Sequence, residues 1–600
     1  MFVMGQTYSK ELLNRAEEGN VDAMRTLGDC YFNGNGTAQD YAKALTWFKK
    51  AAKKHDNYAM NKLGDMHRDG KGLPKDFKKA FSWYRKAAND GDAQGMFNLG
   101  ACYFKGYGVP QSYDLAIQNY KEAATGGHVE AMFRLGEIYA SGEGTEKDVP
   151  VAAGWYSDAA EYGHKESMII LARTYAGGIG IGKDDALALK WYRKSAENGI
   201  KEAFFETAKR YAEGCGTEKN DTEAFKWFCK SAENGNAIAM NIVGEYCYEG
   251  IGTKKNLKTA FDWFTKAAKE EVTNAMYNLA KCYYEGTGTE QDYTEAASWF
   301  VKAAHNGKSE AMYYAGESYY MGRGNEQNYT KAFAWFKKSS ETGNGNAMYY
   351  LGRCYYDGTG ITKNYAQAIQ WFTKAVAKNN KEAMYSLGLC HFEGKGVRKD
   401  YKMAMTWFNE AAERGCTSAL IEIGKCYDEG RGVDADAKTA AAWYRKAAEK
   451  GEPRAYMMLG KCYLYGNGGM LNHTEALKWL EKAAENNVKG TMNLVGDLYL
   501  ERGSTGDSYN KAYAWYKKAA EKGEGDNMKL AYCHYKGIGT SRNFKKAILM
   551  YMKEAEAGNR EAMRYMSEMY EIGGYGINAD KEMSEFWLNK AEEKTDEGSM

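Results

Sequence analysis

The sequence predicts an all-α protein built as a solenoid of sixteen helix–loop–helix repeats of 36 residues. A methionine recurs every 36 residues, from Met24 to Met60 and Met96 and onward, and tryptophan recurs at the same spacing from Trp47 to Trp83 and onward. Each 36-residue stretch contains two segments of helical periodicity joined by a glycine-rich loop. Self-similarity at a fixed period of this length is the signature of repeat architectures, so the period decides the fold class.

The first predicted helix of a repeat is clearest in the stretch from 383 to 415. Small and apolar residues fall on one face at a spacing near 3.6, namely Ala383, Met384, Leu387, Gly388 and His391. The helix is expected to end at Gly394, because glycine adopts the positive φ that a tight connection needs. The methionine of this helix is called the anchor below.

The second predicted helix begins after a residue that can cap its free N–H groups. This cap position carries Asp, Asn or Ser in fourteen repeats: Asp40, Asp76, Ser112, Asp148, Asp184, Asn220, Asn256, Asp292, Asn328, Asn364, Asp400, Asp436, Asn472 and Ser508. In the repeat from 383 to 415, the helix buries one face and closes at a C′ glycine, Gly415. Its buried face carries Tyr401, Ala404, Trp407, Phe408, Ala411 and Ala412. The small residues Gly28 and Ala44 mark where the two helices are expected to approach closely.

With these residues in view, the consensus A-M-x-x-L-G…Y-x-x-G-x-G-T-x-x-D-Y-x-x-A-x-x-W-F-x-K-A-A-E-x-G resembles the Sel1-like repeat, a relative of the tetratricopeptide repeat. The resemblance covers residues 21–594 and implies a right-handed α-solenoid that acts as a protein-binding scaffold with its first helices on the concave surface. Residues 1–20 are predicted to form an N-terminal capping half-repeat with one helix, and 595–600 a C-terminal tail. The repeats after residue 490 are irregular, since Arg502 and Ser504 replace loop glycines and one residue is missing around Met528–Cys533.

Composition excludes several classes of protein. A net charge of +2 over 600 residues indicates no affinity for nucleic acid or anionic lipid. No apolar run is long enough to insert in a membrane, and the N-terminus does not resemble a secretory signal. The sequence therefore predicts a cytoplasmic protein, with delivery as an effector left open. Seven of the twelve cysteines share one repeat position, too far apart for disulfides, and are expected to be small, buried and reduced.

No catalytic constellation is expected. Ser508 and Lys511 match the S-x-x-K pattern of serine β-lactamases, and cysteine-rich relatives have been linked to penicillin binding, but Ser508 is expected to be a helix N-cap. The eight histidines form no pair at helical spacing, so no metal site is expected, and His128 and His164 are expected to face solvent. The recurrent G-x-G is read as a turn, and no cofactor is expected.

The candidate binding surface lies on the first helices, at the positions one, five and eight residues after the anchor, which share one helix face. We call this face the ladder. The candidate partner-binding residues on it are Phe97, Phe133, Phe205, Tyr277, Lys281, Tyr284, Tyr313, Glu317, Tyr320, Tyr349, Arg353, Tyr356, Tyr385 and Phe392. Two interpretations remain open: the rings pack against the next repeat, or they line a groove for a peptide.

A lysine near the end of most second helices, such as Lys50, Lys194 and Lys374, is expected to form a solvated face that complements the helix dipole. The predicted function is a non-catalytic scaffold or adaptor for protein or peptide partners. The alternatives are a penicillin-binding or β-lactamase-like hydrolase and a purely structural spacer. The sequence predicts no oligomeric state.

Overall fold

The structure is a computed structural model that describes residues 7–501, 503, 506–523 and 527–592. Within these ranges the chain contains helices and connections but no β-strand. It divides into two compact units, Met1–Trp299 and Phe300–Met600, each of which is described by itself. The predicted all-α repeat fold is confirmed. The expectations for residues 1–6, Arg502, Ser504 and 595–600 lie outside the described residues.

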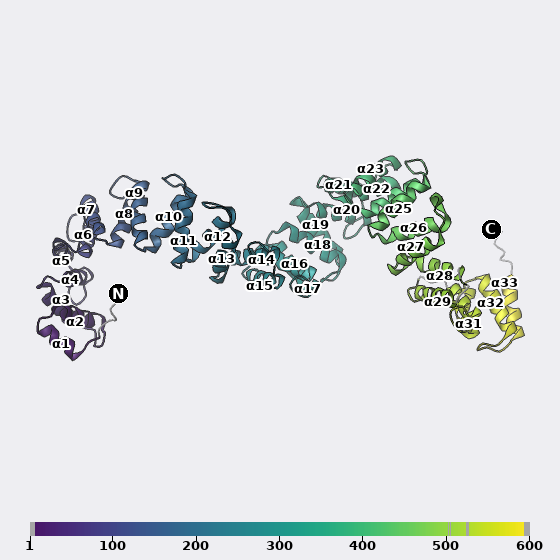
Figure 1. Cartoon of the computed structure of the whole chain (residues 1–600), viewed down its shortest axis with the longest axis horizontal. Helices are drawn as coiled ribbons and strands as arrows, with labels where there is room; N and C mark the ends of the chain where they lie inside the picture. The colour runs from purple at the N-terminus through teal and green to yellow at the C-terminus, as the bar shows by residue number, and fades with distance from the viewer. Residues whose placement is uncertain (1–6, 502, 504–505, 524–526, 593–600) are drawn as a thin grey trace. The chain divides into compact units, whose positions relative to one another are not determined.

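In the first compact unit, α1 (Lys10–Glu17) precedes eight helical hairpins (Figure 1). The first helices of the hairpins are α2 (Val21–Asn33), α4 (Asn57–Asp69), α6 (Ala93–Lys105), α8 (Val129–Ser141), α10 (Lys165–Gly177), α12 (Lys201–Glu213), α14 (Ala237–Glu249) and α16 (Thr273–Glu285). The second helices are α3 (Tyr41–Ala52), α5 (Phe77–Asn89), α7 (Tyr113–Thr125), α9 (Val149–Glu161), α11 (Asp185–Glu197), α13 (Asp221–Glu233), α15 (Leu257–Lys269) and α17 (Tyr293–His305).

The second compact unit continues the same alternation. Its first helices are α18 (Ser309–Met321), α20 (Gly345–Asp357), α22 (Lys381–Glu393), α24 (Thr417–Glu429), α26 (Pro453–Tyr465), α28 (Thr491–Glu501), α30 (Asn527–Lys536) and α32 (Arg560–Ile572). Its second helices are α19 (Tyr329–Glu341), α21 (Tyr365–Val376), α23 (Tyr401–Glu413), α25 (Ala437–Glu449), α27 (His473–Glu485), α29 (Gly506–Glu521), α31 (Phe544–Glu556) and α33 (Lys581–Glu592). A 3₁₀ turn, η1 (Asn467–Gly469), follows α26.

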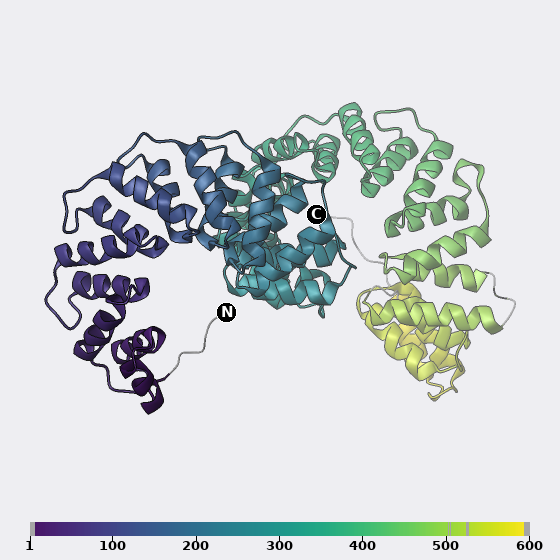
Figure 2. The same cartoon turned by 60° about the vertical axis from the view of Figure 1, so that its left-hand side comes forward.

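Consecutive helices pack against one another in chain order, as Figure 2 shows for the first compact unit. At the N-terminal end, α1 packs on α2 and buries Leu12 and Ala16. This order of packing is that of a solenoid, in which each repeat buries its apolar face against its neighbours.

The helix ends follow the sequence prediction closely. The Asp400 carboxylate accepts a hydrogen bond from the Met403 amide, and the other predicted caps from Asp40 to Asn472 accept equivalent bonds. The first helices end at left-handed glycines such as Gly394, whose φ is 77°. The prediction for Ser508 is wrong, because α29 begins at Gly506 and places Ser508 within its first turn.

The centre of most hairpins is a buried ring packed on a glycine or an alanine of the first helix. The residue after the tryptophan position is aromatic in every hairpin except that of Leu480, and it is fully buried in most repeats, as Phe408 is, whereas Trp407 beside it is only half-buried. A Cβ added to Gly388 of α22 would lie 2.5 Å from the Phe408 ring. Glycine at this position therefore lets the facing ring reach the backbone of the first helix.

The register of α30 corrects the sequence interpretation of the missing residue. Leu530, Ala531 and Cys533 are buried, as Val495, Gly496 and Leu498 are at the corresponding positions of α28. The anchor position therefore falls on Asn527, and the missing residue precedes it instead of lying within Met528–Cys533.

Trp587 lies two full periods after Trp515, but the residue missing before Asn527 moves it one position along within its repeat. Trp587 occupies the position of the buried Tyr551, and Phe586 takes the tryptophan position.

The cysteines behave as small apolar residues in this packing. Ten of the twelve are buried, and Cys215 and Cys229 are half-buried. Burial raises the pKa of the Cys354 thiol to about 11. These thiols therefore stay protonated and contribute packing.

Among the helices that the structure describes, none has both the length and the apolar character that a membrane span requires.

Candidate functional site

The ladder lies on the side of the solenoid where first helices approach one another. Among helices two apart in the chain, the closest approaches are between first helices, α4 with α6 in one compact unit and α20 with α22 in the other. Helices on the inner side of a curved stack lie nearer to each other than those on the outer side. The ladder residues of these helices therefore lie on a side of the hairpins where neighbouring first helices meet.

The tyrosines directly after the anchor are half-buried against the central ring of their own hairpin. The ring centroids of Tyr313, Tyr349 and Tyr385 lie 6.2, 6.0 and 5.9 Å from those of Phe336, Phe372 and Phe408, respectively. Burial raises the pKa of Tyr385 to about 12. One edge of each ring is in packing contact, and the rest remains accessible.

The aromatic residues eight positions after the anchor meet the start of the second helix. Tyr320, Tyr356 and Phe392 make edge-to-face contacts with Tyr329, Tyr365 and Tyr401 at centroid distances of 5.3, 5.2 and 5.2 Å, respectively. Tyr320 also contacts Tyr350 of the next repeat at 5.3 Å. One edge of each of these rings therefore packs within the solenoid, as the packing interpretation of the ladder proposes.

The charged ladder residues are hydrogen-bonded to the tyrosines. The Tyr313 hydroxyl donates to the Glu317 carboxylate at 2.8 Å. The Arg353 guanidinium donates to the Tyr349 hydroxyl at 3.2 Å and to Asp357 at 3.0 Å. These bonds hold the hydroxyls at fixed positions on the surface.

The Tyr356 hydroxyl reaches the next repeat and donates to the Glu393 carboxylate at 2.7 Å. Burial, with this carboxylate beside the hydroxyl, raises the pKa of Tyr356 to about 12. The hydroxyl therefore remains a hydrogen-bond donor throughout the neutral range.

In the first compact unit the predicted ladder residues are packed more variably. Phe205 contacts the central Phe228 ring at 5.7 Å. Tyr284 contacts Tyr293 at 5.4 Å. The Lys281 ammonium lies 3.5 Å from the Glu285 carboxylate of its own helix. Tyr277 of α16 lines a pocket described below.

Phe97 and Phe133 are partly covered by the histidines that were expected to face solvent. Phe133 is 5% exposed and lies 4.4 Å from the His164 ring, and Phe97 stacks on His128 at 4.5 Å. The solvent-facing prediction is wrong because His128 is the N-cap of α8, with its Nδ1 accepting from the Ala131 amide at 3.1 Å. His164 caps α10 in the same way.

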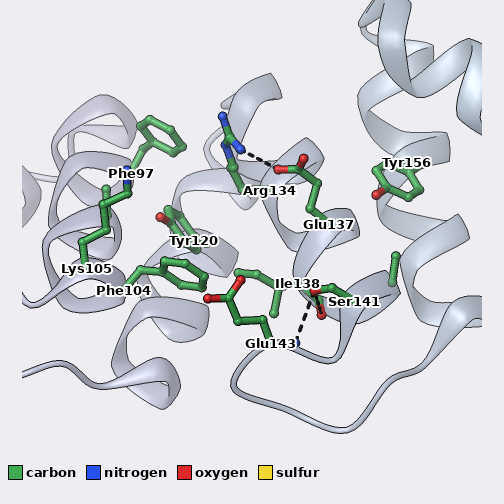
Figure 3. Close-up of a pocket in the computed structure, with 12 residues that line it drawn as sticks. Phe97, Phe104, Lys105, Tyr120, Arg134, Glu137, Ile138, Ser141, Glu143 and Tyr156 are labelled. Carbon is green, nitrogen blue, oxygen red and sulfur yellow. Dashed lines mark hydrogen bonds and ion pairs between the residues drawn. The ribbon is translucent and has the colours of Figure 1, made fainter.

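A pocket of about 720 Å³ opens on the ladder side between α6 and α8 (Figure 3). Its walls and floor are formed by Phe97, Ala101, Phe104, Lys105, Tyr120, Arg134, Glu137, Ile138, Ala140, Ser141, Glu143 and Tyr156. Tyr120 and Tyr156 are the central rings of their hairpins, contributed by α7 and α9. The pocket combines an aromatic floor with charged groups on its rim, the combination that binding sites use for orientation and affinity.

An equivalent pocket of about 390 Å³ lies between α14 and α16. It is lined by Glu245, Tyr248, Glu249, Ile251, Phe264, Tyr277, Asn278 and Lys281. Both pockets lie between neighbouring first helices and above a central ring of the second helix. A pocket between neighbouring first helices is therefore a recurrent feature of the repeat, but the side chains that line it differ from one repeat to another.

Of the residues that line this pocket, the sequence prediction named only Phe97 and missed the charged and floor residues Arg134, Glu137, Tyr120 and Tyr156. Tyr120 and Tyr156 lie on the second helices, outside the ladder positions. A signal for this pocket was the small Ala101 at a ladder position that carries a long side chain in most other repeats.

The lysines near the ends of the second helices lie over tryptophan rings. The Lys374 ammonium is 4.0 Å from the Trp371 centroid, and Lys50 and Lys230 lie 4.0 Å from Trp47 and Trp227, respectively. The expectation of a merely solvated face is therefore incomplete, because the side chains also cover the exposed edges of the half-buried indoles.

The described residues offer no cluster suited to metal binding, since no three or more His, Cys, Asp or Glu side chains converge on one point. Lys511, the second residue of the S-x-x-K pattern, places its ammonium 2.9 Å from the Asp507 carboxylate.

The Sel1 repeat family model matches the chain sixteen times, at residues 21–56, 57–92, 93–128, 129–164, 165–200, 203–236, 237–271, 273–308, 309–344, 345–380, 381–416, 417–452, 453–488, 491–524, 527–559 and 560–596. The comparison with curated proteins gives no match.

Solved structures of repeat proteins are similar to the chain. A protective antigen of uropathogenic Escherichia coli that displays an SLR fold is 30% identical, covering 80% of this chain and 96% of its own, with a TM-score of 0.39. A Sel1 repeat protein from Oxalobacter formigenes is 28% identical over 51% of this chain and 90% of its own, with a TM-score of 0.39. Yeast Tom70 is 16% identical over 84% of this chain and 100% of its own, with a TM-score of 0.30. Because these TM-scores are low, the family assignment rests on the sixteen repeat matches.

Proposed function

Because the chain belongs to the Sel1 repeat family, we propose that it is a non-catalytic scaffold that binds protein or peptide partners on the ladder face of its first helices. The single observation that carries the proposal is the half-buried state of the ladder rings, as at Tyr313, Tyr349 and Tyr385. A tyrosine held by packing on one edge loses little conformational freedom when a partner covers the other edge. The recurrent pockets between first helices supply concave places beside these rings.

The test compares partner capture by three purified proteins: the wild type, a Tyr313→Ala/Tyr349→Ala/Tyr385→Ala variant, and a control. Tyr162→Ala is the control, because Tyr162 is 66% exposed at the end of α9 and lies outside the ladder. We expect partners enriched by the wild type and by the control to be lost with the triple variant. Equal capture by all three proteins would favour the structural spacer.

The triple variant removes packing as well as a binding surface, so its stability must be measured in parallel. Each substitution is expected to lower local stability by about 1–2 kcal/mol, half the value for a fully buried ring. A Tyr349→Phe/Tyr385→Phe variant keeps the rings and removes two hydroxyls. If the triple variant loses stability while every captured partner is retained, the ladder serves packing alone.

The hydrolase alternative has its own measurement. Turnover of a chromogenic β-lactam by the purified chain, abolished by Ser508→Ala, would contradict the proposal. We expect no turnover above that of Ser508→Ala.

A further inference from the structure

We propose that the pocket between α6 and α8 binds the carboxylate of an acidic side chain in a partner peptide, held by the Tyr120 hydroxyl and the Arg134 guanidinium. The inference rests on the proposed scaffold function and specifies the chemistry of the ligand at one place on the ladder face.

The repeats of the second compact unit show what such a site looks like when it is filled from within the chain. Asp497 of α28 accepts a hydrogen bond from the Tyr516 hydroxyl at 2.6 Å. The same carboxylate is bound by the Lys529 ammonium of α30, at 2.8 Å from Oδ1 and 2.5 Å from Oδ2. The floor tyrosine and a cation from the next first helix thus hold one carboxylate between them.

A second filled example lies one repeat before the proposed site. The Tyr84 hydroxyl of α5 donates to the Asp65 carboxylate of α4 at 2.8 Å. Arg68, on the same helix as Asp65, lies 3.1 Å from that carboxylate. A buried tyrosine that holds a carboxylate is therefore a recurrent arrangement at this position.

The 36-residue spacing places the corresponding repeat positions at the pocket between α6 and α8. Tyr120 lies 36 residues after Tyr84, and Ala101 lies 36 residues after Asp65. Arg134 lies 33 residues after Ala101, and Lys529 lies 32 residues after Asp497, the difference being the residue missing before Asn527. The tyrosine and the cation are thus both present at the pocket, but alanine stands where the carboxylate would be.

Alanine at this position leaves the space of the carboxylate open beside the tyrosine and the arginine. Ala101, Tyr120 and Arg134 all line the pocket, which measures about 720 Å³, whereas the pocket beside Asp497 measures about 290 Å³. Tyr120 is 4% exposed, and its hydroxyl has no hydrogen-bond partner in the described part of the chain. The hydroxyl opens into the pocket, where a carboxylate can accept a charge-assisted hydrogen bond from it, which is stronger than a neutral one.

The charges around the pocket limit the ligand to a single acidic group. Arg134 is already paired with Glu130 at 3.2 Å and Glu137 at 2.6 Å. Glu137 and Glu143 also line the pocket and would repel a second negative charge, while Lys105 on the opposite wall attracts the first. The guanidinium has five N–H donors and can bridge more than one carboxylate.

The apolar walls specify what flanks the acidic residue. Phe97 and Phe104 form one side of the pocket, as Figure 3 shows, and Ile138 lies across from them. The peptide is therefore expected to carry aromatic residues next to the acid. An acidic side chain is favoured over a chain-terminal carboxylate because Asp65 and Asp497, the corresponding groups in the filled repeats, are side chains held by a tyrosine and a cation.

The experiment uses the full chain and two matched probes, acetyl-Phe-Asp-Phe-amide and acetyl-Phe-Asn-Phe-amide. Binding is measured by saturation-transfer NMR on the peptides and by calorimetry. We expect the Asp peptide to bind about tenfold more tightly, the discrimination given by one charged hydrogen bond. Tyr120→Phe and Arg134→Gln are each expected to remove most of this preference, and Glu137→Gln to increase it.

The decisive variant is Ala101→Asp, which supplies the carboxylate from within, as Asp497 does in its repeat. We expect it to fold normally, to keep or raise the melting temperature, and to abolish Asp-peptide binding. Ala212→Asp places the same substitution at another half-buried alanine, on α12, and should leave peptide binding unchanged.

Equal affinity for the two peptides, persistence of binding in Ala101→Asp, or no Asp-peptide binding at millimolar concentration would each overturn the inference. None of these results affects the scaffold proposal, which is tested by Tyr313, Tyr349 and Tyr385 in the other compact unit. Loss of partner capture there with no peptide discrimination here would remove the carboxylate site alone.

Discussion

At the scale of single residues, the hairpins depend on a glycine that faces a buried ring. At Gly64, Gly352 and Gly388 an added Cβ would lie within 2.3–2.5 Å of the facing ring. Protein interiors are close-packed and cannot absorb such an overlap without moving the helix. The same chain contains a helical glycine with open space, Gly154 of α9, where nothing lies within 4 Å of an added Cβ.

This contrast gives a prediction with an internal control. Gly388→Ala is expected to destabilise its hairpin by about 1–3 kcal/mol, because the methyl group must displace the Phe408 ring. Gly154→Ala is expected to stabilise by about 0.5–1 kcal/mol, since alanine restricts the unfolded chain and meets no atom. Amide hydrogen exchange in α22 and α9 measures both effects. Opposite signs are required, and a neutral Gly388→Ala would contradict the packing described here.

A second residue-scale prediction concerns His128. Burial lowers the pKa of His128 below its ordinary value, with Glu130 and Asp92 acting in the opposite direction. Its Nδ1 must be unprotonated to accept from the Ala131 amide. As pH falls below about 7, the unfolded histidine binds a proton more readily than the folded one, so the folded state loses stability.

The measurement compares thermal unfolding of the wild type and His128→Asn between pH 7.5 and 5.5. Asparagine caps α14 and α20 in the same way without titrating in this range, so the variant should lose less stability on acidification. Identical pH dependence of the two proteins would show that the cap does not titrate.

At the scale of helices, most second helices carry a lysine near their end that covers the tryptophan of the same helix. The Lys374 ammonium over Trp371 and the equivalent pairs place a cation both on an indole face and near the negative end of the helix dipole. The long side chain also shields the half-buried ring from water. The lysine row is therefore part of the helix packing, which argues against reading it as a site for an acidic ligand.

Lys374→Gln is expected to lower the stability of its hairpin by about 0.5–1 kcal/mol, the value of one exposed cation–π contact. Lys337→Gln is the control, because Lys337 is exposed on α19 and makes no described ion pair or ring contact. Urea unfolding monitored by exchange in α21 and α19 separates the two. Equal effects would mean that the charge acts only through the helix dipole.

At the scale of the whole molecule, a solenoid is held together by contacts between neighbouring repeats. Within each compact unit, helices pack chiefly on those before and after them in the chain. Stability is then a sum of repeat and interface contributions, and opening is local instead of all-or-none. A partner bound across several ladder positions would couple repeats that otherwise respond independently.

The irregular repeats near the C-terminus provide the test of local opening. The helix α28 has 11 residues, whereas first helices such as α22 have 13. We expect amides of α28 to exchange at least tenfold faster than those of α22, because shorter helices bury less surface. Uniform exchange along the chain would indicate a single cooperative unit and contradict this account.

The sequence by itself determined the repeat, the helix caps and the positions of the buried faces. A 36-residue period and capping residues such as Asp400 act through local hydrogen bonds and helical spacing, which can be read without coordinates. Only the Ser508 cap failed, because the helix there starts at Gly506, three residues earlier than the repeat predicts.

The tertiary structure decided which side chains meet across repeats. The pairing of glycine with ring and the contacts of the capping histidines with Phe97 and Phe133 depend on how two helices approach, which the 36-residue period does not specify. The pocket at Ala101 is the clearest case. Tyr516 and Lys529 hold Asp497 at the corresponding position of another repeat. The absence of a carboxylate at Ala101 can be recognised only when the side chains around that position are placed in space.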